Sequence, residues 1–307
     1  MMKINESSEK YFILIGFSEY PQIEFILSLF VSGLYTMTLT GNAAIILVSI
    51  LDSRLHTPMY FFLRNLSFLD MFLTTSIVPQ MLVNMWGNSK ISYLGCMAQL
   101  IVNFAFGSTE CVLLAVMSID RYVAVCMPLR YTTIMHPRIC HILAAISWIW
   151  GFGNSLFQSS LAIALPLCGH HRVDHLLCEL LFLIKLSCVD TRPTEAKMLV
   201  ARLVILIGPV STILTSYACI ARAVVRMKSA EGRWKAFGTC ASHLMVVFLF
   251  YGTVMFMYLQ TENNYSQNLG KALSILYSIV TPTMNPLIYT LRNKDVKRAI
   301  RKFILKN

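Results

Sequence analysis

The chain has 307 residues, of which 56% are hydrophobic and only 13% are charged. Soluble domains average about 25% charged residues, so the composition excludes an ordinary soluble protein and indicates a membrane protein. The formal net charge is +11. The Lys and Arg residues behind this excess lie mainly in loops on one side of the predicted membrane segments. The charge therefore indicates membrane topology and an acidic inner leaflet, not nucleic-acid binding.

Seven apolar stretches are long enough to cross a hydrocarbon core, which needs about 20 residues of helix. We predict an all-α membrane protein with a seven-transmembrane helix bundle, forming one domain over residues 1–307. Residues 1–22 lack the pattern of a cleavable signal peptide, and the charge asymmetry places this N-terminus outside the cell. The helices are expected near residues 23–50, 57–85, 93–120, 139–166, 196–225, 236–260 and 269–291.

The last segment, residues 292–307, is expected to be a cytoplasmic tail. Val296, Ala299, Ile300 and Phe303 fall on one helical face, with Lys and Arg residues opposite. This pattern predicts a short amphipathic helix on the inner leaflet, in preference to a disordered basic tail.

Charged residues within the apolar stretches are the strongest functional signals, because they are costly in a membrane. Asp120 and Arg121 stand at the cytosolic end of the third helix, where they form either a releasable switch or a structural ion pair. Asp70 and Glu110 reach similar depths near the middle of the membrane, at about 1.5 Å of rise per residue. Two such carboxylates either share a proton or hold a cation.

Four separated segments resemble the olfactory receptors, a branch of the rhodopsin-like G-protein-coupled receptors. They are LHTPMYFFL at Leu55–Leu63, MSIDRYVAVC at Met117–Cys126, KAFGTCASH at Lys235–His243 and PTMNPLIY at Pro282–Tyr289. The resemblance covers nearly the whole chain, and the first segment with the short loop 261–269 is similar to the tetrapod, airborne-odorant class.

The resemblance implies a receptor that binds a small volatile odorant within the bundle. It implies activation of a stimulatory, olfactory-type G protein that raises cyclic AMP. The expected location is the plasma membrane, in the cilia of olfactory sensory neurons, with contacts to membrane lipid and with trafficking helper proteins. The alternative is a rhodopsin-like receptor for a non-odorant small molecule. A transporter is disfavoured because no repeated halves are visible, and no nucleophile–base pair or catalytic metal motif indicates an enzyme.

The family pattern also implies roles for particular residues. His243 is expected to gate activation, although a neutral packing role is an equal alternative. A sodium ion is expected at Asp70 and Glu110, with Asn42, Ser67 and Asn285 as helpers; the alternative is a protonated pair without an ion. The residues implied in the switch and in G-protein coupling are Asp120, Arg121, Tyr122, Tyr217, Lys235, His243 and Tyr289.

Four cysteines, Cys96, Cys168, Cys178 and Cys188, fall on the predicted outer side. Four thiols allow three pairings, and the residues alone do not choose among them. The resemblance implies Cys96–Cys178 and Cys168–Cys188. The His and Cys residues of segment 168–178 also suit a metal site, but disulfide formation would remove the thiolates. Asn5 begins a glycosylation sequence in the external segment.

A stripe on the third helix predicts one wall of a ligand site, because its residues follow i, i+3, i+4, i+7 spacing. Arg202 either extends to water at the membrane surface, which we prefer, or binds a carboxylate or carbonyl group. In receptors for biogenic amines, an acidic residue of the third helix binds the amine. By resemblance, Asn103 stands at the corresponding position of this chain, which disfavours biogenic amines as ligands. The predicted ligand residues are Phe104, Gly107, Ser108, Cys111, Arg202, Ile205, Leu206, Tyr251, Val254, Met255, Tyr258, Ile275 and Ser278.

Overall fold

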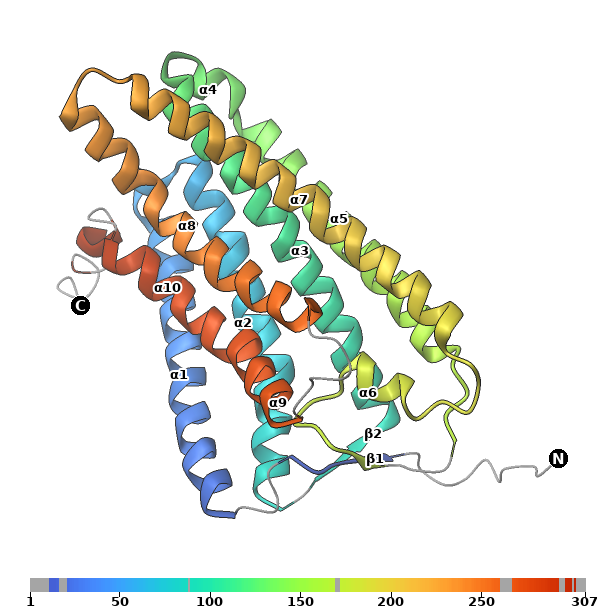
Figure 1. Ribbon diagram of the computed structural model, residues 1–307. Helices are drawn as coiled ribbons and strands as arrows, with labels where there is room; N and C mark the ends of the chain where they lie inside the picture. Colours follow the sequence, from blue (N-terminus) through green and yellow to red (C-terminus); the bar gives the residue numbers. More distant parts are fainter. Residues whose placement is uncertain are drawn as a thin grey trace.

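The computed structural model describes residues 11–16, 21–87, 89–168, 172–259, 267–292, 296–299 and 301, and these are mostly helical (Figure 1). Within these residues, six helices are long and apolar enough to cross a membrane. They are α1 (Pro21–Leu51), α2 (Pro58–Met85), α3 (Tyr93–Cys126), α5 (Pro137–Ile163), α7 (Arg192–Arg226) and α8 (Ala230–Leu259).

The seventh membrane segment is helical throughout but changes its winding. It consists of α9 (Gln267–Ile275), a π-helical segment (Leu276–Val280) and α10 (Thr281–Arg292). The predicted seven-helix bundle is therefore confirmed. The structure extends α3 to Cys126, beyond the predicted end at residue 120, because Tyr122–Cys126 continues the apolar helix past the charged pair.

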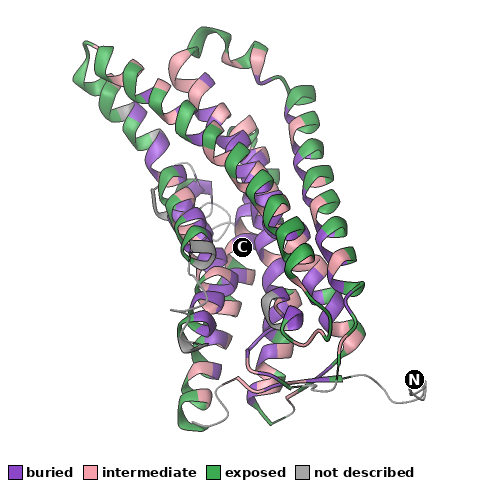
Figure 2. Cartoon of the chain, turned by 45° about the vertical axis from the view of Figure 1, so that its right-hand side comes forward, coloured by how far each residue is buried: buried purple, intermediate pink, exposed green. Residues whose placement is uncertain are grey.

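Exposed residues follow the outward faces of the helices and buried residues the faces between them (Figure 2). Large apolar side chains such as Ile26, Ile149 and Phe248 are exposed on the outward faces of their helices, whereas Asn42 and Asp70 are buried between helices. Lipid tails solvate apolar surface but cannot satisfy polar groups, so this arrangement suits a bilayer.

A small sheet, which the all-α prediction did not include, covers part of one end of the bundle. This end is the one predicted to face outward and is called the outer end below, and the opposite end is called the cytosolic end. β1 (Tyr11–Leu14) lies in the centre, antiparallel to β2 (Lys90–Ser92) and parallel to β3 (Arg172–Val173). Strands of two to four residues are too short to show the alternating pattern by which strands are recognised in a sequence.

Covalent and ionic contacts hold the outer loops on the helices. Cys96 of α3 is bonded to Cys178, and Cys168 is bonded to Cys188, with Cα–Cα distances of 5.4 and 5.5 Å. This is the pairing that the family resemblance implied. Lys271 of α9 contacts both Asp174 Oδ1 and the carbonyl oxygen of Gly16 at 2.6 Å, so one ammonium joins three separate segments of the chain.

The opposite end of the bundle has shorter connections. α4 (Tyr131–Ile134) lies between α3 and α5 (Figure 1). In the tail, residues 296–299 are helical, with Val296 and Ala299 buried and Lys297 and Arg298 exposed. This agrees with the predicted amphipathic face; Ile300 and Phe303 lie outside the described residues.

Candidate functional site

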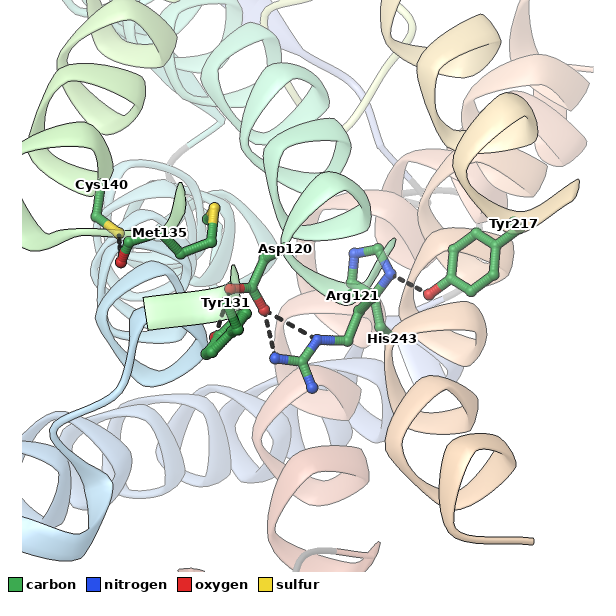
Figure 3. Close-up of polar contacts among 7 residues, drawn as sticks. All are labelled: Asp120, Arg121, Tyr131, Met135, Cys140, Tyr217 and His243. Carbon is green, nitrogen blue, oxygen red and sulfur yellow. Dashed lines mark hydrogen bonds and ion pairs between the residues drawn. The ribbon is translucent and has the colours of Figure 1, made fainter. Parts of the chain in front are cut away.

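An ion pair closes the cytosolic end of α3. Arg121 donates from Nε to Asp120 Oδ2 at 3.0 Å and contacts the same oxygen with a terminal nitrogen, while the Tyr131 hydroxyl donates to Asp120 Oδ1 at 2.7 Å (Figure 3). Asp120 is fully buried and Arg121 is only 9% exposed. Burial and the nearby Asp120 carboxylate raise the pKa of the Tyr131 phenol, which keeps it protonated as a donor. Asp120 is thus held by both α3 and α4.

A second contact joins α7 to α8 at the same end of the bundle. The Tyr217 hydroxyl and His243 Nδ1 are 2.7 Å apart, and the two rings stack with centroids 5.9 Å apart (Figure 3). His243 is fully buried and close enough to Arg121 for electrostatic interaction. Tyr289 of α10 is also buried there. The structure therefore brings four predicted switch residues, Arg121, Tyr217, His243 and Tyr289, into one region.

Two other predicted switch residues are placed differently. Tyr122 is partly buried and lines a hollow of about 430 Å³ together with residues of α7, among them Ser216 and Cys219. It therefore faces the α3–α7 contact, away from the Asp120–Arg121 pair. The side chain of Lys235 lies outside the described residues.

The two deep carboxylates lie together in the middle of the bundle. Asn285 Nδ2 donates to both oxygens of Asp70, at 3.2 and 3.0 Å. Asp70 and Glu110 are fully or almost fully buried and interact electrostatically. Among the described residues, Glu110 Oε1 and Asn285 Oδ1 have no hydrogen-bond partner. Two residues of this buried region thus each keep an acceptor oxygen that has no partner within the described part of the chain.

Asn42 and Ser67, the other expected helpers of this site, are also buried, and Asn42 Oδ1 likewise has no hydrogen-bond partner among the described residues. Asn42 donates from Nδ2 to the carbonyl oxygens of Thr38, at 3.0 Å, and Pro282, at 3.2 Å. Its amide thereby joins α1 to the seventh membrane segment. Ser67 is buried on α2, one helical turn before Asp70.

A cavity of about 150 Å³ lies in the outer half of the bundle, between α3, α5, α7, α8 and the π-helical segment. The disulfide-linked loop covers it, because Leu177, Cys178, Glu179 and Leu180 form part of its lining. Most of the side chains predicted to contact a ligand line this cavity: Phe104, Gly107, Ser108, Cys111, Arg202, Ile205, Leu206, Val254 and Ser278.

Three predicted ligand residues do not line it. Tyr251 donates its hydroxyl to the Cys111 carbonyl oxygen at 2.8 Å and supports the wall from behind. Met255 is 37% exposed, because α8 is rotated so that Phe250 and Val254 face inward. Ile275 packs against the cluster of α1 and α2 that contains Val31. The side chain of Tyr258 lies outside the described residues.

The lining also includes residues that the sequence analysis missed. Gln158 of α5 accepts from Arg202 Nε at 3.5 Å, and Phe250 and Tyr277 complete the wall. Arg202 thus faces the cavity, and its binding of a ligand group stays a prediction. Polar residues in a membrane helix commonly face other helices, so Asn154 and Gln158, one turn apart, were a usable signal.

Comparisons with known proteins agree with this arrangement. A family model described as olfactory receptor matches residues 31–307. The chain is 58% identical to human olfactory receptor 2G6 over 306 residues, which cover 99% of this chain and 97% of that one. It is 56% identical to human olfactory receptor 2Y1 over 305 residues, which cover 99% of this chain and 98% of that one.

A solved structure shows the same fold. The chain matches the crystal structure of squid rhodopsin with a TM-score of 0.73, over 92% of this chain and 85% of that chain. Because the two are only 17% identical in sequence, this likeness concerns the arrangement of the helices.

Proposed function

Because the chain belongs to the olfactory receptor family, a family of receptors and not of enzymes, we propose that it binds a small volatile odorant and activates a stimulatory, olfactory-type G protein, which raises cyclic AMP. One observation supports the proposal above the others. The same helix, α3, lines the outer cavity from Phe104 to Cys111 and carries the buried Asp120–Arg121 pair at its cytosolic end. A ligand and a G protein can therefore act on one rigid element.

The proposed mechanism links the cavity to Arg121 through α8. Val254 and Phe250 line the cavity, and His243 lies further along the same helix, against Tyr217. An odorant that favours outward movement of α8 separates His243 from Tyr217 and uncovers Arg121. The guanidinium then leaves Asp120 and donates hydrogen bonds to the carboxyl terminus of the G protein, which Lys235 helps to attract.

We further propose that a sodium ion stabilises the resting state at Asp70 and Glu110. The residues fit such an ion, because two buried carboxylates and the unpartnered oxygens of Glu110 and Asn285 provide hard oxygen ligands. These groups belong to α2, α3 and α10, so a bound cation would hold the three helices together. A shared proton is the alternative, and salt-dependent thermal stability that is lost in Asp70→Asn would distinguish the two.

The chain is a multi-pass membrane protein. We propose that it resides in the plasma membrane of olfactory cilia with its N-terminus outside, and that it needs helper proteins for export. The Cys96–Cys178 and Cys168–Cys188 bonds support this orientation, because disulfides persist in oxidising compartments. Glycosylation at Asn5, which lies outside the described residues, would also require an external N-terminus.

The test is a cyclic AMP assay in cells that express the receptor with an olfactory-type G protein and a trafficking helper. A chemically diverse odorant panel is applied to the unmodified receptor, to Arg121→Ala and to Arg192→Ala. Arg192 is the matched control, because its side chain is 90% exposed at the start of α7, where it pairs with Asp190. We expect responses to some odorants that Arg121→Ala abolishes and Arg192→Ala preserves, at equal surface expression.

Two results would contradict the proposal. A full response in Arg121→Ala would exclude this arginine as the coupling group. Silence of a surface-expressed receptor across the whole panel would count against odorant activation through this G protein.

A further inference from the structure

Four polar side chains form a continuous chain along one wall of the outer cavity. Arg202 of α7 donates from Nε to Gln158 Oε1 at 3.5 Å, and Gln158 donates from Nε2 to Asn154 Oδ1 at 3.3 Å. Asn154 in turn donates from Nδ2 to Ser108 Oγ at 2.7 Å. Arg202, Gln158 and Ser108 line the cavity. The chain therefore joins α7, α5 and α3 at the ligand site.

The direction of these hydrogen bonds is fixed by the arginine. A guanidinium has no acceptor, so the oxygen of Gln158 must face Arg202 and its NH₂ group must face Asn154. The same reasoning places the NH₂ group of Asn154 toward Ser108. Each member polarises the next in such a series, so the chain strengthens the last donor in it.

That last donor is the hydroxyl group of Ser108. Its oxygen accepts from Asn154, and among the described residues no hydrogen bond that Ser108 donates is found. Ser108 is only 7% exposed and lines the cavity. A buried hydroxyl favours an acceptor, and the cavity is where a ligand can supply it.

Most of the remaining wall is apolar, and it limits the size and character of the ligand. Asn103 is a further polar residue of the lining, and its buried Oδ1 has no hydrogen-bond partner among the described residues. Phe104, Leu206, Phe250 and Val254 present apolar surface. An apolar cavity of about 150 Å³ in another protein holds benzene, and this cavity has a similar volume of about 150 Å³. A ligand of roughly six to ten non-hydrogen atoms, mainly hydrocarbon, therefore fits.

The charges in the cavity disfavour an ionised ligand. Arg202 lines the cavity and so does Glu179, which accepts a hydrogen bond from Ser274 and lies 3.8 Å from His175 Nε2. A carboxylate in this small space would approach Glu179, and an ammonium would approach Arg202. A neutral molecule avoids both repulsions.

We propose that the cavity binds a neutral carbonyl compound, a ketone, aldehyde or ester, whose oxygen accepts a hydrogen bond from Ser108. The proposal deepens the proposed function and rests on its assumption that the outer cavity is the ligand site. Ser108 contacts the ligand directly. Asn154, Gln158 and Arg202 are positioning residues, because they orient the Ser108 oxygen as an acceptor and leave its proton for the carbonyl group.

The experiment measures ligand binding without signalling. The purified full-length receptor is heated with each compound, and dissociation constants are obtained from the concentration dependence of the unfolding temperature. Aliphatic and aromatic ketones, aldehydes and esters are compared with size-matched hydrocarbons, amines and carboxylic acids. One such set is 2-octanone, nonane, octylamine and heptanoic acid, each of about nine non-hydrogen atoms. We expect carbonyl compounds to bind, and to bind more tightly than their matched partners.

Two serine substitutions identify the group responsible. Ser108→Ala should weaken carbonyl binding about tenfold, because one hydrogen bond is lost, and should leave hydrocarbon binding unchanged. Ser155→Ala is the matched control on α5, since Ser155 donates to the Ile101 carbonyl oxygen at 2.6 Å and does not line the cavity. If Ser108→Ala fails to fold, Ser108→Thr, which keeps a hydroxyl group, and Asn154→Ala provide the comparison. The preference for carbonyl compounds over their matched partners should persist in Ser108→Thr and decrease in Asn154→Ala.

Several results would overturn the inference. The first is that no carbonyl compound binds. The second is that the matched acid, amine or hydrocarbon binds as tightly as the carbonyl compound or more tightly. The third is an unchanged carbonyl affinity in Ser108→Ala or, where that variant does not fold, in Asn154→Ala. Failure of the proposed function is separate. Carbonyl binding without a cyclic AMP response supports the inference and contradicts the signalling proposal, whereas cyclic AMP responses to amines alone do the reverse.

Discussion

The outer and cytosolic halves of the bundle use the same helices but pack them differently. In the cytosolic half, large apolar side chains fill the centre, and Phe62, Leu66, Leu113 and Met117 are at most 1% exposed. In the outer half, α3 presents Gly107 and Ser108 to its neighbours, and a cavity remains between the helices.

The means of holding the two halves also differ. In the outer half, the Cys96–Cys178 disulfide and the Lys271–Asp174 ion pair connect the loops to the helices. At the cytosolic ends, hydrogen bonds such as Tyr217–His243 join the helices to one another. Hydrogen bonds between side chains exchange partners easily, and disulfides do not. We infer that the outer half is a fixed container for a ligand, whereas the cytosolic half rearranges when α8 moves.

The strongest test of this difference is removal of the outer disulfides. The chain-entropy model assigns more stabilisation to the longer loop: Cys96–Cys178 spans 82 residues and Cys168–Cys188 spans 20. Replacing both members of the first pair with Ser should lower the free energy of unfolding by about 4–5 kcal/mol, against about 3 kcal/mol for the second.

Thermal unfolding of the purified receptor and surface expression measure both losses. Because neither pair touches the Asp120 region, basal signalling per surface receptor should stay constant. Equal losses for the two pairs, or a changed basal signal, would contradict the view of a fastened outer half.

A smaller effect is expected where α5 crosses α3. A Cβ atom added to Gly151 would lie 2.7 Å from both the Ala105 carbonyl oxygen and the Thr109 amide nitrogen. Backbone atoms cannot move aside cheaply, so Gly151→Ala should lower the free energy of unfolding by about 3 kcal/mol.

Gly153 is the matched control, because an added Cβ there meets nothing within 4 Å. Gly153→Ala should leave the unfolding temperature unchanged or slightly raise it. A similar loss in both variants would show that the close approach of α5 to α3 does not determine stability.

Substitutions in the cytosolic half should change the basal signalling of the receptor. Asp120→Asn weakens the ion pair to Arg121 and should raise basal cyclic AMP about tenfold, as expected for loss of a charge-assisted hydrogen bond. Tyr131→Phe removes only the hydroxyl that donates to Asp120 at 2.7 Å, so about a twofold to fivefold rise is expected.

Basal cyclic AMP per surface receptor is the measurement for both variants, with Arg192→Ala again as an external control. The affinity for the odorant should change little in Tyr131→Phe. A basal level that is unchanged in Asp120→Asn would contradict the interpretation of this pair as the resting lock.

The two halves were unequally predictable from the sequence, for a physical reason. Asp120, Arg121 and Asp70 stand out because charged residues are costly in a membrane, and the apolar runs around them determine the seven spans. The cavity, in contrast, is lined by residue types that occur in any helix core. Its prediction depends on the rotation of each helix about its own axis.

Particular residues show how that rotation was missed. On α8, Tyr251, Val254 and Met255 were all expected to face the cavity. Val254 does line it, but Phe250, which was not expected, takes the place of Tyr251 and Met255. In the seventh segment, the π-helical turn brings Tyr277 to the wall and leaves Ile275 outside it. Such shifts arise from packing against neighbours, which a single helix does not encode.

The smallest effect is expected at Gly107 in the cavity wall. A Cβ atom on Gly107 would overlap the hydroxyl oxygen of Tyr277. Since this oxygen is at the end of a side chain that can turn, Gly107→Ala should cost little stability. The displaced phenol would enter the cavity, so the affinity for the odorant should fall about fivefold, or about 1 kcal/mol. Ligand-dependent thermal stabilisation measures the change.

The double variant Gly107→Ala/Tyr277→Phe separates displacement of the phenol from simple loss of volume. Without the hydroxyl, the added methyl group has room, so affinity should recover toward that of Tyr277→Phe alone, with a coupling energy of about 0.5–1 kcal/mol. Gly208→Ala is the control, because an added Cβ meets nothing within 4 Å. Additive effects of the two substitutions would mean that the methyl group itself fills the cavity. The Tyr277 side chain would then keep its place when the methyl group is added, so the wall of the outer cavity would be rigid.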